Sequence, residues 1–371
     1  MIIGLDASRG NREIKSGVEW YSHHIIRNLY KIYFRNQYWL YTDKELNQDL
    51  KPSRPNFEEK LLNWPLKRFW TLGRMSLEMV FKKPDVLFIP SHTFPLVGGK
   101  KNVITWHDIG YERYPETYTA WELASLKGGA RRAFKMADRI ITISNFTKNE
   151  MMERHNLDSE KIRVIYLGCN HQRWQPIEPE ALKEFLRRKN ITLPYFIYVG
   201  RMALRKNLIG LIRVYNLFRE KVRRPHNLIL VGSPAPLQEE IDDEIMASPF
   251  KNEIKKLGWV EMNDLPALVG GAQALVYPSI FEGFGLPAIE AMACGVPVIA
   301  STSGSLPEVV GDAGILKDAH DVEGLAEAMQ QVTEDGNLRR ELIAKGLARA
   351  REFSWEKCAR ETLEVLENIK P

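Results

Sequence analysis

The sequence YPSIFEGFGLPAIEAMACGVP, residues 277–297, is the stretch that decides the fold. The apolar run that leads into it, residues 272–277, predicts a short buried strand. Pro287 fits the first turn of a helix that continues to Cys294, and Gly295 stands where a left-handed cap is usual. A strand, a glycine-rich loop and a helix in this order predict one unit of an α/β protein. The free N–H groups at the helix N-terminus predict a site for phosphate.

Two carboxylates accompany this loop and helix, Glu282 in the loop and Glu290 in the helix. If the helix began at Glu282, the two would lie about 12 Å apart at about 1.5 Å per residue. That separation is too long for a pair that breaks one bond, and it suits two contacts to one extended ligand. Taken alone, a glycine-rich turn is common in α/β domains, and Glu290 could equally be a solvated helix residue.

The string EGFGLPAIEAMACGVPVIA, in which seven residues separate Glu282 from Glu290, resembles the E-x7-E signature of the retaining glycosyltransferases of family 4. The resemblance implies that Glu290 holds the nucleotide ribose and that Glu282 lies at the transferred sugar. It also implies that the backbone amides after Glu282 face the sugar and phosphate. These donor-binding amides belong to Gly283, Phe284, Gly285 and Leu286.

Length and composition predict a globular protein of two domains. The 371 residues are too many for one ordinary core, and 44% hydrophobic with 27% charged residues is typical of soluble chains. No run approaches the roughly 18 uncharged apolar residues of a membrane span, and the opening MIIGLDASRG lacks the features of a signal peptide. Three cysteines without metal-ligand spacing favour a reduced, cytoplasmic compartment.

Charge is distributed unevenly. Residues 1–190 hold 32 Lys and Arg against 22 Asp and Glu, whereas residues 191–371 hold 20 against 25. The excess predicts an anionic acceptor or surface beside the first half. Within it, residues 60–83 read as a helix with Trp64 and Trp70 among basic residues. Such a helix either lies in a membrane interface or packs as an ordinary half-buried helix with a solvated basic face.

The first half begins with a strand at residues 2–5, a polar loop and a helix that opens near Gly17. The loop lacks G-x-G-x-x-G, which argues against a dinucleotide oxidoreductase. Gly17 either only permits the turn or, as the family resemblance implies, lets the donor phosphates approach. Further strands are expected at residues 38–41, 85–90, 102–106, 139–143 and 162–166.

The strand at residues 102–106 delivers His107 to the edge of the sheet where parallel sheets bind ligands. A lone histidine there could equally be structural. The segment VITWHDIGYERYPE resembles the His-Asp segment of the family, whose histidine points into the interdomain cleft near the transferred sugar.

The second half repeats the pattern with a strand at residues 195–199, followed by Gly200 and Arg201 and a helix that opens at Lys206. Two cations beside a strand-to-helix loop can meet a diphosphate. YVGRMALRKN resembles the GR…K segment of the family, whose Arg and Lys neutralise the leaving nucleoside diphosphate; Arg205 could share the role of Lys206.

Other segments of the second half complete the expected organisation. The segment KLGWV, ending at Val260, resembles the family loop that reads the base through backbone groups. The family resemblance implies a GT-B fold, with two Rossmann-like doubly wound parallel-sheet domains facing an interdomain cleft. Residues 1–170 would form the acceptor-side domain and residues 171–353 the nucleotide-sugar domain, with a final helix, 354–371, packing back on the first.

The expected chemistry is the departure of a nucleoside diphosphate from a sugar C1. Fixed positive groups aimed at the leaving phosphate are the largest catalytic term, and Arg201, Lys206 and the amides after Glu282 would supply them. Asp-x-Asp is absent and no cluster has ligand spacing, so neither a metal nor a cofactor is expected. A double displacement needs two carboxyls about 5–5.5 Å apart, and nothing in the sequence certifies such a pair. A front-face route is therefore favoured, in which Glu282 orients the sugar and acceptor and His107 binds the sugar.

The donor and acceptor remain open. The segments VITWHDIGYERYPE and GVEWY look most like bacterial mannosyltransferases that use GDP-mannose, with a UDP-sugar as the next candidate. The acceptor would be a sugar, a glycan or a polyprenyl-linked molecule at the inner membrane surface. A nucleotide-sugar epimerase, a phosphorylase-like enzyme and a non-catalytic nucleotide-sugar binder are the competing functions. Nucleic acid is not expected as a partner, because no binding module is present.

Overall fold

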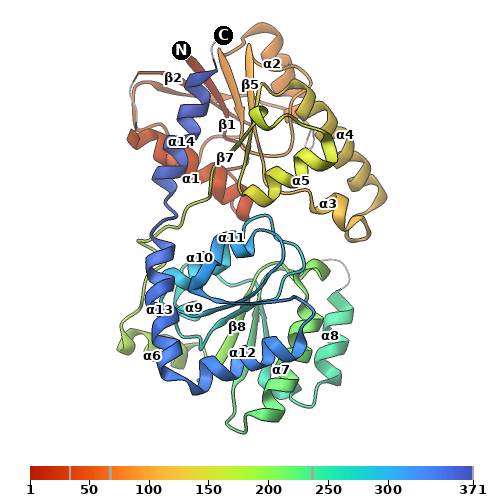
Figure 1. Ribbon diagram of the computed structural model, residues 1–371. Helices are drawn as coiled ribbons and strands as arrows, with labels where there is room; N and C mark the ends of the chain where they lie inside the picture. Colours follow the sequence, from red (N-terminus) through yellow and green to blue (C-terminus); the bar gives the residue numbers. More distant parts are fainter. Residues whose placement is uncertain (33–34, 67–68, 235–237, 370–371) are drawn as a thin grey trace. The chain divides into compact units, whose positions relative to one another are not determined.

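The computed structural model describes residues 1–32, 35–66, 69–234 and 238–369. The chain divides into two compact units. The first unit comprises Met1–Gly168 together with Ser354–Pro371, and the second comprises Cys169–Phe353 (Figure 1). Each unit is an α/β structure built on its own parallel sheet, so the fold class expected from the sequence is confirmed.

The sheet of the first unit has seven strands within the described residues, in the order β3-β2-β1-β4-β5-β6-β7. All neighbours pair in parallel. The central strands β4 and β5 are almost wholly buried because helices cover both faces of the sheet. The strands are β1 (Ile2–Asp6), β2 (Gln37–Thr42), β3 (Phe57–Leu61), β4 (Val86–Ile89), β5 (Lys101–Trp106), β6 (Arg139–Thr142) and β7 (Ile162–Val164).

The helices of the first unit lie on both faces of this sheet. Helix α14 packs against α1, where His24 stacks on Trp355 with ring centroids 4.6 Å apart and Asn36 Nδ2 donates to Glu367 Oε1 at 2.6 Å (Figure 1). The helices are α1 (Gly17–Ile32), α2 (Ser76–Phe81), α3 (Gly110–Arg113), α4 (Ala120–Met136), α5 (Asn145–His155) and α14 (Trp355–Asn368). A π-helical turn, Thr71–Met75, leads into α2, and 3-10 turns form at Pro115–Thr117 and Ser159–Lys161.

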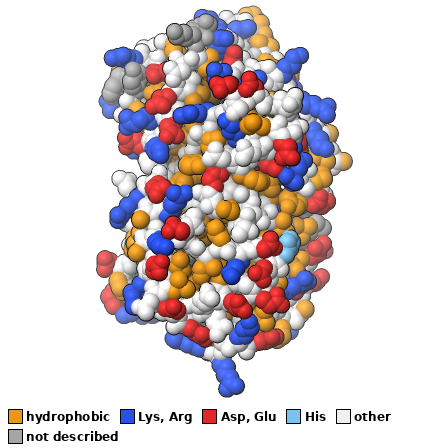
Figure 2. Space-filling model, in the orientation of Figure 1, with side chains coloured by type: hydrophobic (Ala, Val, Ile, Leu, Met, Phe, Trp, Pro, Cys, Tyr) orange, Lys and Arg blue, Asp and Glu red, His pale blue; other side chains and the backbone are white. Residues whose placement is uncertain are grey.

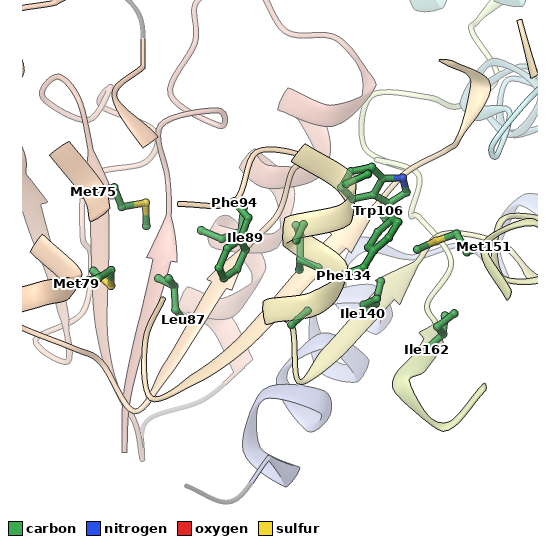
Figure 3. Close-up of a cluster of buried hydrophobic side chains, with 14 of the residues drawn as sticks. Met75, Met79, Leu87, Ile89, Phe94, Trp106, Phe134, Ile140, Met151 and Ile162 are labelled. Carbon is green, nitrogen blue, oxygen red and sulfur yellow. The ribbon is translucent and has the colours of Figure 1, made fainter. Parts of the chain in front are cut away.

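A continuous apolar core joins α2, α4 and α5 to the sheet of the first unit (Figure 3). Met75 and Met79 contribute from the helical segment, Trp106 from the end of β5 and Phe134 from α4. Trp106 and Phe134 meet edge to face, with ring centroids 4.6 Å apart. This core fixes the carboxyl ends of β4 and β5, where His107 is placed.

The single helix expected over residues 60–83 is wrong. The chain instead continues as edge strand β3 to Leu61, and the helical part begins only at Thr71. The reason is local: Trp64 precedes Pro65, a position that disfavours helical backbone. Trp70 is instead buried, and its Nε1 donates to the Leu62 carbonyl at 2.8 Å. Residues 67–68 lie outside the described residues.

The sheet of the second unit has six described strands in the order β10-β9-β8-β11-β12-β13, again all parallel. Its order along the chain repeats that of the first sheet, because the first strand of each unit lies between its second and its fourth. The strands are β8 (Tyr195–Val199), β9 (Asn227–Val231), β10 (Ile254–Gly258), β11 (Leu275–Tyr277), β12 (Val298–Ser301) and β13 (Ile315–Lys317).

Helices again cover the sheet of the second unit. They are α6 (Pro179–Arg188), α7 (Leu208–Lys221), α8 (Gln238–Ala247), α9 (Leu265–Gly270), α10 (Leu286–Ala293), α11 (Leu306–Val310), α12 (Val322–Glu334) and α13 (Gly336–Ala350). Three 3-10 turns, Leu204–Lys206, Lys251–Glu253 and Gly311–Ala313, complete the unit. In sheets of this strand order, ligands bind beyond the carboxyl ends of the strands where the order reverses, which is beside β1 and β4 in the first unit and β8 and β11 in the second.

The charge excess belongs to the first unit. Its residues include 30 Lys and Arg against 23 Asp and Glu, whereas the second unit has 22 against 24. On the face shown in Figure 2, basic and acidic side chains are interspersed. Within the described ranges, no helix combines the length and the apolar character needed to cross a membrane.

Candidate active site

The two loops that carry the predicted diphosphate-binding residues meet at the strand-order reversal of the second unit. Strands β8 and β11 are neighbours, and Ile197 pairs with Leu275. Beyond their carboxyl ends, the Ile280 N–H donates to the Arg205 carbonyl at 2.9 Å, and Arg205 Nη1 donates to the Phe281 carbonyl at 3.4 Å. Arg205 therefore ties one loop to the other.

Lys206 and Glu282 form a buried ion pair across these loops. Lys206 is only 5% exposed, and its ammonium also donates to the Tyr277 hydroxyl at 3.3 Å. Tyr198 stacks on Tyr277 beneath the pair, with ring centroids 5.7 Å apart. Burial, with the Glu282 carboxylate second, raises the pKa of both phenols well above the usual range. Both hydroxyls are therefore neutral at physiological pH.

The backbone of Glu282 is held by the loop after β12. The Ser305 N–H and its Oγ both donate to the Glu282 carbonyl, at 3.1 and 3.0 Å. Gly304 adopts a left-handed φ of 65°, and a Cβ on it would lie 2.4 Å from the same carbonyl oxygen. Residue 304 must therefore be glycine. Sequence reasoning missed both residues; the only available signal was the small-residue string STSGS.

Helix α10 begins at Leu286, and Glu282 lies in the loop before it. The separation of about 12 Å between Glu282 and Glu290 assumed a helix that starts at Glu282, so it does not apply. Gly285 ends the loop with a φ of 102°, and a Cβ on it would lie 2.7 Å from Leu306 Cδ2 and 3.7 Å from Glu282 Cγ. Pro287 stands at the start of α10, and Gly295 follows its end with a φ of 71°.

Of the remaining residues around α10, Gly283 and Phe284 are buried and Leu286 is half-buried. The Phe284 ring packs edge to face against Phe353, with centroids 5.8 Å apart, so its side chain is a packing group. Any contact from Phe284 to a donor would come from its backbone.

Glu290 lies on α10 and is half-buried. Burial raises the pKa of its carboxyl to about 8, and the charge of Arg173 offsets only part of that rise. At pH 7 the carboxyl is therefore largely protonated, and it can both donate and accept a hydrogen bond. This environment differs from the solvated helix face that was the alternative from sequence.

Arg201 is exposed, and within the described part of the chain its side chain forms no ion pair. Its carbonyl accepts from the Tyr198 hydroxyl at 3.1 Å. Gly200 has a φ of 154°, and a Cβ on it would lie 2.7 Å from the same hydroxyl. The Arg201 guanidinium is thus a solvated cation on a well-fixed backbone.

Val260 follows β10, the edge strand of the second sheet, and is half-buried. The Gly232 N–H donates to the Gly258 carbonyl at 2.8 Å, which joins the loop after β9 to the end of β10. The backbone near Val260 is thereby placed at the same carboxyl edge as the loops described above.

The first unit places His107 at the carboxyl end of β5. Its side chain is 5% exposed, and its Nε2 lies 3.2 Å from the Pro90 carbonyl. The Tyr21 ring meets it edge to face at 5.0 Å. Burial lowers the pKa of the His107 imidazole, so the ring is neutral at pH 7.

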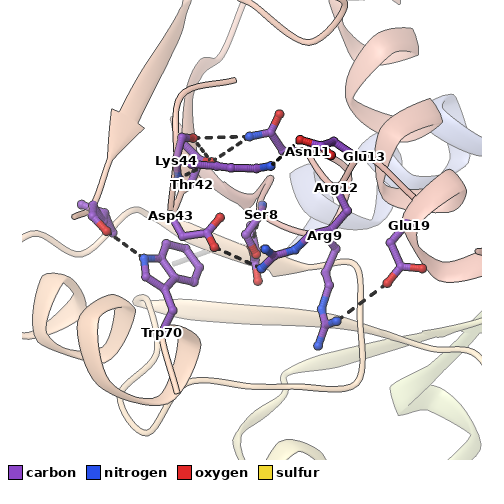
Figure 4. Close-up of polar contacts among 12 residues, drawn as sticks. Ser8, Arg9, Asn11, Arg12, Glu13, Glu19, Thr42, Asp43, Lys44 and Trp70 are labelled. Carbon is purple, nitrogen blue, oxygen red and sulfur yellow. Dashed lines mark hydrogen bonds and ion pairs between the residues drawn. The ribbon is translucent and has the colours of Figure 1, made fainter. Parts of the chain in front are cut away.

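The loop before α1 is rich in cations that are already paired. Arg9 lies 3.7 Å from Glu19, and Arg12 lies 3.0 Å from Asp43 (Figure 4). Buried Asn11 fixes the loop, because its Nδ2 donates to the Glu45 carbonyl at 2.9 Å. Gly17 itself is exposed, and a Cβ on it would meet no atom within 4 Å. No protein atom therefore demands a glycine there.

Of the expected catalytic residues, the structure brings Lys206 and Glu282 into contact, while Arg201 extends from the loop after β8. His107 and Gly17 belong to the first unit. Among the residues that the structure describes, no group of three or more His, Cys, Asp or Glu side chains is placed to hold a metal ion.

Two doubly wound α/β units, the second with a cation–carboxylate pair at its strand-order reversal, define the class of protein. Comparison with family models gives Glycosyltransferase Family 4 over residues 15–173 and Glycosyl transferases group 1 over residues 182–349.

Individual relatives agree with these models. The chain is 34% identical over 300 residues to O-antigen chain mannosyltransferase B of Escherichia coli, covering 81% of this chain and 76% of that protein. It is 28% identical over 271 residues to O-antigen chain mannosyltransferase RfbU of Salmonella typhimurium, covering 73% and 70%. The chain therefore belongs to glycosyltransferase family 4 and is a hexosyltransferase.

Solved structures show the same fold. Sucrose-phosphate synthase from Thermosynechococcus elongatus superposes with a TM-score of 0.76 at 20% identity, covering 100% of this chain and 99% of that one. Anabaena Alr3699/HepE in complex with UDP-glucose gives a TM-score of 0.75 at 20% identity, covering 99% of both chains. The fold is GT-B, as expected from the sequence.

Proposed function

We propose that this hexosyltransferase moves a mannosyl group from GDP-mannose to a glycan or lipid-linked acceptor, with retention of configuration at C1. The carrying observation is the buried Lys206–Glu282 pair at the strand-order reversal of the second unit. In this proposal, the pair would supply a fixed cation where the diphosphate leaving group gains charge. The mannosyltransferase names of the relatives support mannose, and the UDP-glucose complex of a structural neighbour makes a UDP-sugar the next candidate.

In this proposal, Arg201 and Lys206 neutralise the diphosphate together with the amides of residues 283–286. Arg201 is solvated and can turn toward an incoming phosphate, whereas Lys206 is held by Glu282 and Tyr277. A diphosphate that binds Lys206 competes with Glu282 for the ammonium. The Glu282 carboxylate is then available to orient the transferred sugar and the acceptor hydroxyl.

The contact between Glu282 and the Lys206 ammonium supports a front-face route. A double displacement requires a second carboxyl about 5–5.5 Å away, acting as nucleophile or acid. The charged group in contact with Glu282 is the Lys206 ammonium instead. In the proposed route, the acceptor oxygen bonds to C1 on the face from which the diphosphate leaves, and the departing phosphate oxygen takes the acceptor proton.

The remaining donor contacts follow from position and protonation. Glu290, protonated at pH 7 in the ligand-free state, would contact the ribose hydroxyls. The backbone near Gly200 and Val260 would contact the phosphate and the base, and Gly17 would let the donor approach the start of α1. His107 would bind a hydroxyl of the transferred sugar.

The proposed place of action is the cytoplasmic face of an anionic membrane, where a polyprenyl-linked acceptor would be met. Helix α2 buries Met79 in the core, yet it also exposes Leu77, Val80 and Phe81, which are 50%, 56% and 76% exposed. A helix that is apolar on both sides is normally covered. Exposed Lys82 and Lys83 follow directly, a combination typical of contact with acidic headgroups.

Calorimetry with GDP-mannose, UDP-glucose, GDP and UDP tests the proposal, followed by an assay of acceptor-dependent nucleotide release. We expect GDP-mannose to bind more tightly than UDP-glucose, and the Lys206→Met variant to lose most of this affinity. Binding without any transfer would favour the non-catalytic binder, and conversion of the sugar nucleotide without an acceptor would favour the epimerase. Failure of every nucleotide to bind would refute the proposal.

A further inference from the structure

The segment that follows β4 contacts His107 at two separate points. Strands β4 and β5 are parallel neighbours, and Ile89 pairs with Ile104, so residues 90–92 run beside the end of β5. The His107 N–H donates to His92 Nε2 at 2.9 Å, and His107 Nε2 lies 3.2 Å from the Pro90 carbonyl. Two residues of one short segment therefore hold both the backbone and the ring of His107.

These contacts determine the protonation of both rings. A carbonyl oxygen only accepts hydrogen bonds, so His107 Nε2 must carry a hydrogen, and in the neutral ring Nδ1 is then the acceptor. A backbone N–H only donates, so His92 Nε2 is unprotonated and the hydrogen of that ring lies on its Nδ1. Burial, followed by the neighbouring His107, lowers the pKa of His92 to about 3, so its accepting nitrogen persists at physiological pH.

The surroundings leave little freedom for either ring. His92 lies 4.6 Å from the Trp106 ring and 5.3 Å from the His107 ring, and Tyr21 closes the other side of His107 at 5.0 Å. Thr147 Oγ1 donates to the His107 carbonyl at 3.4 Å. The charged groups that act on the pair are Asp108, Glu19 and Arg9.

We propose that His92 is a positioning residue for His107, and that His107 presents Nδ1 as a hydrogen-bond acceptor to a hydroxyl of the ligand. An uncharged hydroxyl can donate to that lone pair, whereas an unprotonated phosphate or carboxylate oxygen would be repelled by it. The inference rests on the proposed function only in taking that hydroxyl to belong to the transferred sugar. The tautomers and the role of His92 follow from the contacts within the first unit alone.

The test compares two substitutions of His92 in the full-length protein. His92→Gln keeps an acceptor near the position of Nε2, while His92→Phe keeps a ring and removes the acceptor. His155→Phe is the matched control, because His155 is another partly buried histidine of the same unit, packed on Phe134. The histidines are labelled with 15N, and the His107 signals are assigned from the spectrum of His107→Gln.

In the wild type at pH 7, we expect His107 as the Nε2–H tautomer and His92 as the Nδ1–H tautomer. His92→Gln and His155→Phe should keep the His107 tautomer. His92→Phe should give a mixture of tautomers, because the released His107 backbone lets Nε2 move away from the Pro90 carbonyl. Loss of one backbone hydrogen bond should lower kcat/KM of His92→Phe about tenfold, mainly through KM for the sugar donor, with His92→Gln restoring most of it.

An Nδ1–H or doubly protonated His107 at pH 7 would overturn the proposal. So would a His92→Phe variant whose His107 tautomer and kinetics match the wild type. The spectra do not depend on turnover, so failure of the proposed function and failure of this inference are separate outcomes. Wild-type tautomers as expected, with no turnover of any sugar nucleotide, would count against the proposed function and leave the role of His92 standing.

Discussion

Lys206 and Glu282, separated by 76 positions in the sequence, form a buried ion pair, and the Lys206 ammonium also donates to the Tyr277 hydroxyl. The pair joins the loop that follows β8 to the loop that precedes α10. A buried cation in this position has two roles. It holds the Glu282 carboxylate in place, and in the proposed function it would offer a preorganised charge to the diphosphate.

Replacing Lys206 should therefore damage catalysis and stability together. We expect Lys206→Met to lower kcat about 100- to 1000-fold, the usual cost of a lost transition-state donor. The free energy of unfolding should fall by about 1–3 kcal/mol, because the Glu282 carboxylate loses its partner. Steady-state assays and urea unfolding measure the two effects.

The double variant Lys206→Met/Glu282→Gln separates the effect on catalysis from the effect on stability. It should regain most of the lost stability, since no unpaired charge is buried, and none of the lost activity. Lys221→Met, at an exposed position at the end of α7, is the control and should match the wild type. Near wild-type turnover of Lys206→Met would remove Lys206 from the proposed machinery.

Arg201→Ala should lower activity and leave stability almost unchanged. Arg201 is exposed, and the described structure gives its side chain no ion pair, so the free energy of unfolding should change by no more than about 0.5 kcal/mol. If the guanidinium meets the diphosphate, kcat should still fall about 100-fold, and GDP should bind more weakly in calorimetry. Arg223→Ala, an exposed arginine of the same unit, should leave both unchanged. Equal GDP affinity in Arg201→Ala and the wild type would contradict the assignment.

Glu290 should make the second unit less stable at alkaline pH. Its pKa rises from 4.5 to about 8 on folding, so the folded state holds the proton more tightly than the unfolded state does. The free energy of unfolding should then decrease as the pH rises from about 4.5 to about 8, by at most about 1.4 kcal/mol per pH unit.

Urea unfolding between pH 4.5 and 9 of the wild type and of Glu290→Gln measures this effect. The neutral amide has no proton to lose, so the difference in stability between the variant and the wild type should shift in favour of Glu290→Gln as the pH rises. If the free energy of unfolding depended on pH in the same way for the two proteins, the Glu290 carboxyl would be more solvated than it is in the structure.

Gly304→Ala tests how Glu282 is held. The new Cβ would lie 2.4 Å from the Glu282 carbonyl oxygen, so the Glu282 loop must shift. We expect a loss of at least tenfold in kcat, although residue 304 has no proposed contact with substrate. Gly311→Ala is the matched control: Gly311 also has a positive φ, 59°, but a Cβ there meets nothing closer than 4.0 Å. Both variants should lose stability from backbone strain, Gly304→Ala the more because its Cβ also meets the Glu282 backbone, and only Gly304→Ala should lose activity. Equal activity of the two variants would show that the Glu282 loop tolerates displacement.

The apolar surface of α2 predicts binding to acidic vesicles. The wild type should sediment with vesicles that contain phosphatidylglycerol and not with vesicles of phosphatidylcholine alone. Phe81→Ser should weaken this binding about tenfold, since burial of a large apolar side chain contributes about 1.5–3 kcal/mol. Met246→Ser removes a comparably exposed side chain, 64% exposed, from the second unit and should have no effect. Failure of the wild type to sediment with acidic vesicles would favour a soluble acceptor.

Much of the fold was predictable because parallel strands covered on both faces are short apolar runs. The expected strand at residues 195–199 coincides with β8, and the expected strand at residues 139–143 exceeds β6 by a single residue. Strand β3 was missed because it is an edge strand that carries Glu58, Glu59 and Lys60, and its place depends on pairing with β2. Strand β13 was missed because it has only three residues.

The site was less accessible from sequence. The residue types at 201, 206, 282 and 290 were identified from the motif, and their roles stay predictions. The contacts of Gly304 and Ser305 with Glu282 could not be foreseen, because they join loops that are neighbours only through the pairing of β11 with β12. The contacts of residues 90–92 with His107 likewise depend on the register of β4 against β5.

The first unit is assembled from two separate lengths of chain, whereas the second is continuous from Cys169 to Phe353. During synthesis, the second unit can therefore acquire all its internal contacts while α1 still lacks its α14 neighbour. The bond from Asn36 to Glu367 closes a span of 331 positions and can form only after α14 has left the ribosome. A protein truncated before Ser354 would thus keep every residue of the second unit, and its first unit would leave uncovered the side of α1 that packs on α14, an exposed surface that favours aggregation.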